Sequence, residues 1–236
     1  MAVNSFTFNG VNSLTYGLYV SGDKTFNSAE KDYTKVSVPG RSGDLLLFNN
    51  RYKNVNTTYR GIVISDYERH TADIRAWLLS ADGYCRLEDT YHPNEYRMAS
   101  FAGPIEFDTM MLEAGETELV FDCKPQRWLK SGEEWITVNY GTIRSISNPT
   151  LFSAKPIIRI YGSGRVQIGS GDITVNTPGN SYIDIDCDIQ DCYESNINRN
   201  HQVTISKWPI LNPGNNGISI SEGVTKIQIL PRWWTL

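Results

Sequence analysis

Short apolar stretches with a period of two most strongly constrain how this chain can fold. In the second half, stretches rich in β-branched residues recur between turn residues, as at 157–160, 165–168, 173–175 and 182–189, with hardly any helical period. Successive side chains of a strand point to opposite faces of a sheet, so this pattern is typical of strands. Many short strands separated by regular turns predict an antiparallel β-sandwich for this half.

The first half also predicts strands and turns, but with one α-helix. Ser65 and Glu68 have the spacing of a capping box, in which both side chains satisfy free amides at a helix start. Gly83 is a natural stop, because glycine adopts a left-handed backbone without strain. We therefore expect a helix between them, with one buried face formed by Ile74, Trp77, Leu78 and Ala81.

Polar and turn-forming residues separate the two halves. Ser131-Gly132-Glu133-Glu134 is polar, and Asn139-Tyr140-Gly141 and Asn148-Pro149 are turn signals. A chain of 236 residues is long enough for two domains of ordinary size. We predict a mainly β protein with a first domain at 1–130, a junction at 131–147 and a second domain at 148–236.

Composition excludes several classes of function. Apolar residues make up 40% of the chain and charged residues 20%, which favours a packed core. The net charge is −4 without a Lys/Arg cluster, so specific nucleic-acid binding is not expected. No run approaches the ~20 apolar residues of a membrane span. The start of the chain lacks the pattern of a secretory signal, so we expect folding in a cytoplasm.

Candidate catalytic and metal-binding residues are few. A hydrolytic triad needs a His base beside a nucleophile, and the chain has only His70, His92 and His201, without a Gly-x-Ser-x-Gly elbow. Cys187 and Cys192 are five residues apart with no His beside them, which does not match a zinc site. We expect four free thiols, no enzyme activity, and no catalytic, cofactor or metal site.

Two further motifs have simple explanations. Asp184, Asp186 and Asp188 resemble the opening of a calcium loop but lack its later Gly and Glu, so we expect them to face water, although a weak surface cation site stays an alternative. Their apolar neighbours would then point inward: Ile183, Ile185, Cys187 and Ile189. Gly162-Ser163-Gly164 lacks the residues of a phosphate loop, and we expect a hairpin turn there.

Two segments are candidates for contact with another subunit or partner. Arg41 and the apolar run that follows it adjoin a Gly-rich loop, and could form an arm that packs on a neighbour or a simple core strand. That run consists of Leu45, Leu46, Leu47 and Phe48. Near the C-terminus, the adjacent Trp233 and Trp234 must point to opposite sides of a strand, so both cannot face one core. We expect one of them to dock on another domain or partner.

Six segments of the chain, taken in order, carry a resemblance to a known family: Phe6-Thr7-Phe8-Asn9-Gly10-Val11, Val38-Pro39-Gly40-Arg41-Ser42-Gly43-Asp44-Leu45, Ala76-Trp77-Leu78-Leu79, Gly83-Tyr84-Cys85-Arg86-Leu87-Glu88-Asp89, Tyr96-Arg97-Met98-Ala99 and Phe121-Asp122-Cys123-Lys124-Pro125-Gln126. Together they resemble the N-terminal domain of distal tail proteins of long-tailed bacteriophages, especially those of Gram-positive hosts. The resemblance covers roughly the first 130 residues and continues more loosely through 156–162 and 182–186.

The resemblance implies a structural hub protein of the virion, at the tail tip or baseplate. Members of the family form a homo-hexameric ring, built by the N-terminal domain, while a galectin-like sandwich projects outward. The ring joins the tail tube protein to a tail-associated tip protein, and in many phages it anchors receptor-binding proteins. DNA crosses its lumen, so we expect a neutral or negative lumen, because each neutralised phosphate would add affinity. Assembly would take place in the host cytoplasm.

The alternative is a carbohydrate-binding module that recognises bacterial cell-wall glycan through exposed aromatic residues. A sugar-binding galectin groove resembles His-x-Asn-Pro-Arg followed by Trp-Gly-x-Glu. In the second half the only His is His201, followed by Gln202-Val203, and no Trp is followed by Gly. We therefore favour a sandwich that serves as a scaffold without binding sugar.

Overall fold

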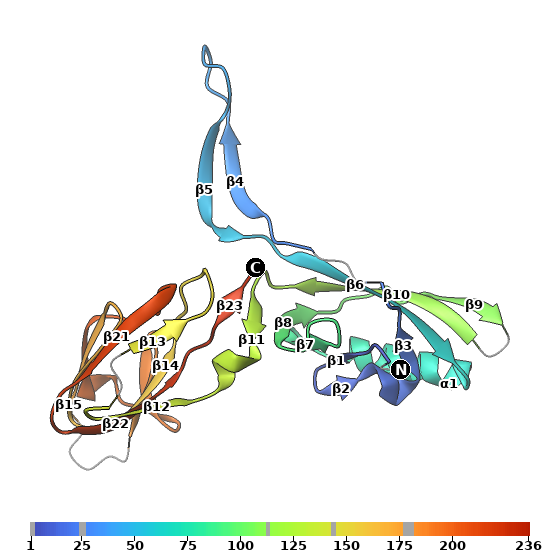
Figure 1. Ribbon diagram of the computed structural model, residues 1–236. Coiled ribbons are helices and arrows are strands. Elements are labelled where there is room, and N and C mark those ends of the chain that lie inside the picture. The colour runs from blue at the N-terminus through green and yellow to red at the C-terminus, as the bar shows by residue number, and fades with distance from the viewer. Residues whose placement is uncertain (1–2, 24–26, 112–113, 143–144, 177–181) are drawn as a thin grey trace. The chain divides into compact units, whose positions relative to one another are not determined.

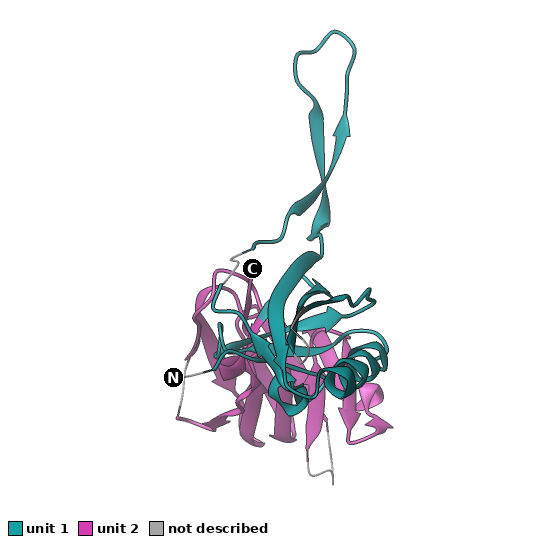
Figure 2. Ribbon diagram, turned by 90° about the vertical axis from the view of Figure 1, so that its right-hand side faces the viewer, with its two compact units in different colours: residues 1–127, 236 teal, residues 128–235 magenta. Residues whose placement is uncertain are grey.

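The computed structural model describes residues 3–23, 27–111, 114–142, 145–176 and 182–236. The chain divides into two compact units, 1–127 with residue 236, and 128–235 (Figure 2). The division lies three residues before the expected domain end at residue 130. The expected junction at 131–147 contributes β12 (Ile136–Asn139) and β13 (Ser145–Asn148) to the second unit, because its apolar residues Val138 and Ile146 are buried there.

Unit 1 is built on one sheet of antiparallel neighbours in the order β2-β1-β7-β8-β10-β6-β3, with β9 also paired to β10 (Figure 1). The two longest strands, β6 and β10, pair over their full length of ten residues. The strands are β1 (Phe6–Phe8), β2 (Val11–Asn12), β3 (Leu18–Val20), β6 (Val55–Ile64), β7 (Cys85–Asp89), β8 (Glu95–Ser100), β9 (Phe107–Met111) and β10 (Ala114–Cys123).

Aromatic side chains fill the core of unit 1. The Phe6 ring stacks between Tyr59, with centroids 4.8 Å apart, and Trp77, with centroids 5.6 Å apart. Phe121 meets Phe6 edge-on, with centroids 5.4 Å apart. Such aromatic pairs add stability beyond the burial of their area. The alternation of β10 places Leu119 and Phe121 in this core and leaves the intervening side chains on the opposite face.

The expected helix is present as α1 (Tyr67–Leu79), and its buried residues include Ile74, Trp77 and Leu78. Its predicted capping box is wrong. The N-cap residue is Asp66, which makes no side-chain cap. Ser65 and Asp66 both have positive φ, so the Ser65 hydroxyl does not reach the first turn, and the Ser65 carbonyl instead lies 3.1 Å from His70 Nδ1.

Unit 2 consists of two antiparallel sheets that share one core, which confirms the predicted β-sandwich. Their orders are β12-β22-β14-β17-β18-β19 and β13-β21-β15-β16-β20. The remaining strands are β14 (Ile157–Gly162), β15 (Gly164–Ile168), β16 (Gly171–Val175), β17 (Ile183–Asp186), β18 (Asp191–Glu194), β19 (Ile197–Asn198), β20 (Val203–Lys207), β21 (Gly214–Ile220) and β22 (Val224–Leu230). β11 (Arg127–Leu129) pairs with β23 (Trp234–Thr235).

The predicted hairpin at Gly162-Ser163-Gly164 is wrong, because this turn carries the chain from one sheet to the other. β14 pairs with β17 and β22, whereas β15 pairs with β16 and β21. Gly162 has φ +98°, and a Cβ there would lie 2.2 Å from the Gly223 carbonyl oxygen. The glycines are therefore required by a close backbone approach at the edge of the sandwich.

Candidate subunit-interaction surfaces

A two-stranded hairpin projects from unit 1 without packing on its core. It consists of β4 (Lys31–Val36) and β5 (Leu45–Tyr52), and β5 leads directly into β6 (Figures 1 and 2). Among the described residues, these strands form a separate sheet of two. We call residues 31–52 the arm. An isolated two-stranded hairpin is marginally stable in water, so an arm of this kind gains stability when something covers it.

Both faces of the arm are apolar and exposed. The pairs Tyr33–Phe48 and Lys35–Leu46 lie on one face, and the pair Val36–Leu45 lies with Leu47 on the other. Leu45 is 40% exposed, Leu46 55%, Leu47 49% and Phe48 41%. The alternative that these residues form a core strand is therefore wrong, because within the described chain β5 pairs with β4 alone and its apolar side chains are exposed. A contiguous exposed apolar surface is typical of an interaction site.

Arg41 lies in the turn at the tip of the arm, between Gly40 with φ +77° and Gly43 with φ +87°. Positive φ values at both positions suit glycine, so the turn follows directly from the local sequence. Arg41 is exposed, and its amide donates to the Val38 carbonyl at 3.1 Å. The structure thus places Arg41 in the turn that leads into the exposed apolar run.

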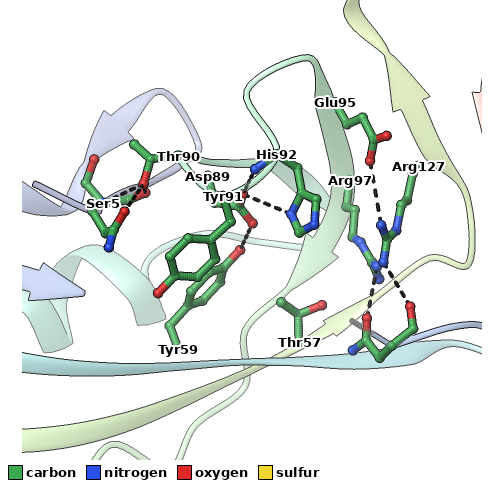
Figure 3. A network of polar contacts seen from close by, with 12 residues as sticks. Ser5, Thr57, Tyr59, Asp89, Thr90, Tyr91, His92, Glu95, Arg97 and Arg127 are labelled. Carbon is green, nitrogen blue, oxygen red and sulfur yellow. Dashed lines mark hydrogen bonds and ion pairs between the residues drawn. The ribbon is translucent and has the colours of Figure 1, made fainter. Parts of the chain in front are cut away.

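Two arginines fix the base of the arm. Asn27, just before the arm, accepts from Arg97 Nη2 at its side-chain oxygen (3.0 Å) and from Arg127 Nη2 at its carbonyl (2.9 Å). Its side-chain amide donates to the carbonyl of Asn56, where the chain returns from the arm. Glu95 forms an ion pair with Arg127, with Oε2 3.8 Å from Arg127 Nη1 (Figure 3). Burial, and then the charge of Arg97, lower the pKa of Arg127.

We call the contacts of Arg97 and Arg127 with Asn27 the clamp. A second group of polar contacts lies beside the clamp (Figure 3). The Tyr59 hydroxyl donates to Asp89 Oδ2 at 2.7 Å, and the His92 backbone amide donates to Asp89 Oδ1 at 2.7 Å. Burial, and then the charge of Asp89, raise the pKa of Tyr59 well above its usual value. The phenol therefore stays a hydrogen-bond donor at neutral pH, which suits a structural role.

The two C-terminal tryptophans are covered within unit 2. Trp233 is 4% exposed and belongs to the sandwich core. Trp234 stacks on Phe152, with ring centroids 4.5 Å apart, and donates its indole N–H to the Ser153 carbonyl at 3.0 Å. The two rings thus have different surroundings, as expected for adjacent strand residues. Trp233 is too deeply buried to contact a partner, so we do not retain it as an interface residue. Trp234 is half-buried, and its contact with a partner stays a prediction.

The aspartates of β17 are ion-paired rather than solvated. Asp184 is 5% exposed and accepts two bonds from Arg159, at 2.7 and 2.9 Å. Asp186 is equally buried and accepts two from Arg232, both at 2.8 Å. The expectation that these carboxylates face water is wrong, and Ile189, expected to point inward, is exposed at the turn after β17. The guanidinium groups stand where a cation would have to bind.

The described parts of the chain hold no group of three or more His, Cys, Asp or Glu side chains placed to bind a metal. No described helix combines the length and apolarity that crossing a membrane requires. All four cysteines are free, and three of them are buried, namely Cys123, Cys187 and Cys192. Burial raises the pKa of Cys192 to about 12. These thiols are therefore protonated and unreactive at neutral pH.

Sequence reasoning did not identify Tyr33, Val36 or Asn27 as parts of this region. Tyr33 and Val36 are the cross-strand partners of Phe48 and Leu45. A signal was available for these two, because a hairpin through the loop at 39–44 pairs residues on either side of it. No signal was available for Asn27, whose importance depends on arginines 70 and 100 residues away.

The two units together have the fold of a hub protein from the adsorption apparatus of phages that infect Gram-positive bacteria. One solved structure with this fold is that of the SPP1 Dit (gp 19.1) protein. The alignment covers 100% of both chains with a TM-score of 0.77 and 14% sequence identity. No family model matches the chain, and no curated protein matches its sequence. The mainly β fold expected from the resemblance to distal tail proteins is confirmed.

Proposed function

We propose that this chain is a structural tail-hub protein of a long-tailed phage, located in the virion at the tail tip or baseplate. The observation that carries the proposal is the uncovered arm, whose two apolar faces have no cover within the described chain. The shared fold with SPP1 Dit, whose structure is described as a paradigm of the hub adsorption apparatus, supports the same role.

In this proposal six copies form a ring in which each arm packs on the neighbouring copy. Arg41, Leu45, Leu46, Leu47 and Phe48 are the contact residues of the arm. Covering both faces of the arm would remove apolar surface from water at about 25 cal/mol per Å². The ring would join a tail tube protein to a tail-associated tip protein and could anchor receptor-binding proteins. Unit 1 builds the ring, and unit 2 projects from it.

A ring of six copies would carry a formal charge of 6 × (−4) = −24. A channel for DNA works best when its wall does not bind phosphate, because each neutralised phosphate adds affinity and slows transit. The acidic chain is suitable for a lumen through which DNA passes without specific binding. The proposal includes neither insertion into a membrane nor an enzymatic step.

Measuring the mass of the purified chain by light scattering tests this function. We expect a species of six times the 26.7 kDa chain mass, visible as a ring by negative-stain electron microscopy. A chain that stays monomeric at millimolar concentration, both alone and with purified tail tube protein, would contradict the proposal.

A glycan-binding module is the second candidate, because aromatic side chains lie beside one sheet of unit 2. Trp135 is 40% exposed at the start of β12. However, the Arg159 guanidinium lies 5.0 Å from the Trp135 ring and 4.3 Å from the Tyr182 ring, so these rings already hold a cation where a sugar would stack. A pull-down on purified cell walls separates the candidates, since Trp135→Ala would abolish retention by a glycan-binding module but not affect a hub.

A further inference from the structure

Unit 1 contains an acidic groove of about 730 Å³ on the face of β6 and β10 that is opposite the core. The end of β3 and the segment 103–108 also line it. Five carboxylates and one guanidinium line the groove, a formal net charge of −4: Asp23, Glu106, Asp108, Glu116, Glu118 and Arg60. A cleft lined by one sign of charge concentrates the field and attracts the opposite sign.

Most of this negative charge is uncompensated. Arg60 Nε lies 3.2 Å from Glu118 Oε2, and that is the one ion pair that the groove carboxylates make within the described chain. Glu106 and Glu116 are both exposed and both line the groove. Ile62 and Val120 add apolar side chains to the lining of the groove. The surface thus combines acidic groups with apolar contact area, which suits a basic and apolar partner.

The arm has the complementary character. Near its base, Arg51 pairs with Asp32 at 2.6 Å and Lys53 with Glu30 at 3.3 Å. Toward its tip, Lys35 and Arg41 make no ion pair with any described residue, and both are exposed. Lys35 is the cross-strand partner of Leu46, and Arg41 lies in the turn that leads into the apolar run at 45–48. The arm points away from the sheet that carries the groove, so its tip is not in contact with the groove of its own chain (Figure 1).

We propose that the acidic groove of one copy receives the arm tip of a neighbouring copy, with Lys35 and Arg41 facing Glu106 and Glu116. This inference rests on the proposed function, because it names the acceptor for the arm in the ring. Charge complementarity then fixes which surface the apolar arm covers and disfavours other pairings. Such an interface weakens as salt is added, because the Debye length is only about 8 Å at physiological ionic strength.

Reversing the charges of the arm tip or of the groove tests whether the groove receives the arm. In the arm variant, Lys35→Glu with Arg41→Glu, we expect the association constant measured by light scattering to fall about tenfold or more. The groove variant, Glu106→Lys with Glu116→Lys, should lower the association constant by a similar factor. All four substitutions in one chain restore opposite charges, and association should return toward that of the unsubstituted chain. Lys155→Glu with Lys207→Glu, at exposed positions of unit 2, lowers the net charge as much as the arm variant does and should have little effect on association.

Each outcome of these measurements supports or overturns either the groove as the acceptor or the proposed function. Losses in both variants with recovery in the fourfold variant establish the groove as the acceptor. If neither variant changes association while Leu46→Ser with Leu47→Ser abolishes it, the arm still assembles the ring but the groove is not its acceptor. A loss without recovery in the fourfold variant also overturns the groove. An unsubstituted chain that stays monomeric overturns the proposed function itself.

Discussion

The arm and the C-terminal segment 231–234 are both candidates for an interface in the sequence, but the structure covers only one of them. Trp233 lies in the sandwich core, and its carbonyl accepts from the Leu129 amide at 2.9 Å. Arg232 donates its backbone amide to the Gly132 carbonyl at 2.9 Å. The arm strands have no comparable neighbour among the described residues. An apolar segment is therefore covered or exposed according to which strands flank it, not according to its own composition.

Because the C-terminal segment is covered by unit 2, we expect it to stabilise that unit. Substitution in this segment should have the largest effect on stability. Trp233→Ala should lower the free energy of unfolding by about 3–5 kcal/mol, because it removes a large side chain from a closed core. Five of the six tryptophans belong to unit 2, so intrinsic fluorescence during urea unfolding reports on that unit. Trp234→Ala is the matched control and should cost less. Equal stability of Trp233→Ala and the unsubstituted chain would contradict the assignment.

Arg232→Ala should have a smaller but still large effect, because it leaves the buried Asp186 without its partner. We expect a loss of about 3 kcal/mol at pH 7. Burial alone would raise the pKa of Asp186, but hydrogen bonds from Arg232 and the amides of Asp188 and Ile189 outweigh it, and the pKa is lowered. The pair therefore stabilises unit 2 above the unfolded pKa of about 3.9, and this contribution is lost as pH falls below it.

Urea unfolding between pH 7 and pH 3 measures this linkage. The unsubstituted chain should lose stability as pH falls through about 4, and the loss should be smaller in Arg232→Ala. Arg165→Ala breaks the more exposed Arg165–Asp172 pair and serves as the control. Parallel pH profiles for Arg232→Ala and the unsubstituted chain would show that the pair does not stabilise the fold.

Local patterns were sufficient to predict the sandwich and the helix face, because alternation and 3.6-residue periodicity are properties of neighbouring residues. Ile74, Trp77 and Leu78 are buried as expected. The solvent-facing assignment of Asp184 and Asp186 failed, because the guanidinium groups that compensate their burial come from residues 25 and 46 positions away. The sequence also left open whether 45–48 forms an arm or a core strand, since both give one apolar run.

Because the arm is exposed, substitutions in it should affect assembly rather than folding. Leu46→Ser with Leu47→Ser replaces exposed side chains from opposite faces of the arm, so the free energy of unfolding should change by no more than about 0.5 kcal/mol. Association measured by light scattering should fall at least about tenfold, because apolar contact area is lost. Leu151→Ser, at a position 87% exposed in unit 2, is the control and should not affect association. A stability loss above 2 kcal/mol, on the order of a core substitution, would mean that the arm packs on its own unit.

The smallest expected effect concerns how firmly the arm is held. Arg97→Ala removes the bond to the Asn27 side chain while Arg127 still holds the Asn27 carbonyl. We expect a stability loss of about 1 kcal/mol, the usual contribution of one such bond, and faster amide hydrogen exchange in the arm than in the rest of unit 1. Arg86→Ala, on the neighbouring strand β7, is the matched control, because Arg86 stacks on Tyr96 and does not touch Asn27. Exchange in the arm that rises equally in both variants would mean that the clamp does not hold the arm, and that the backbone between β5 and β6 alone sets its direction.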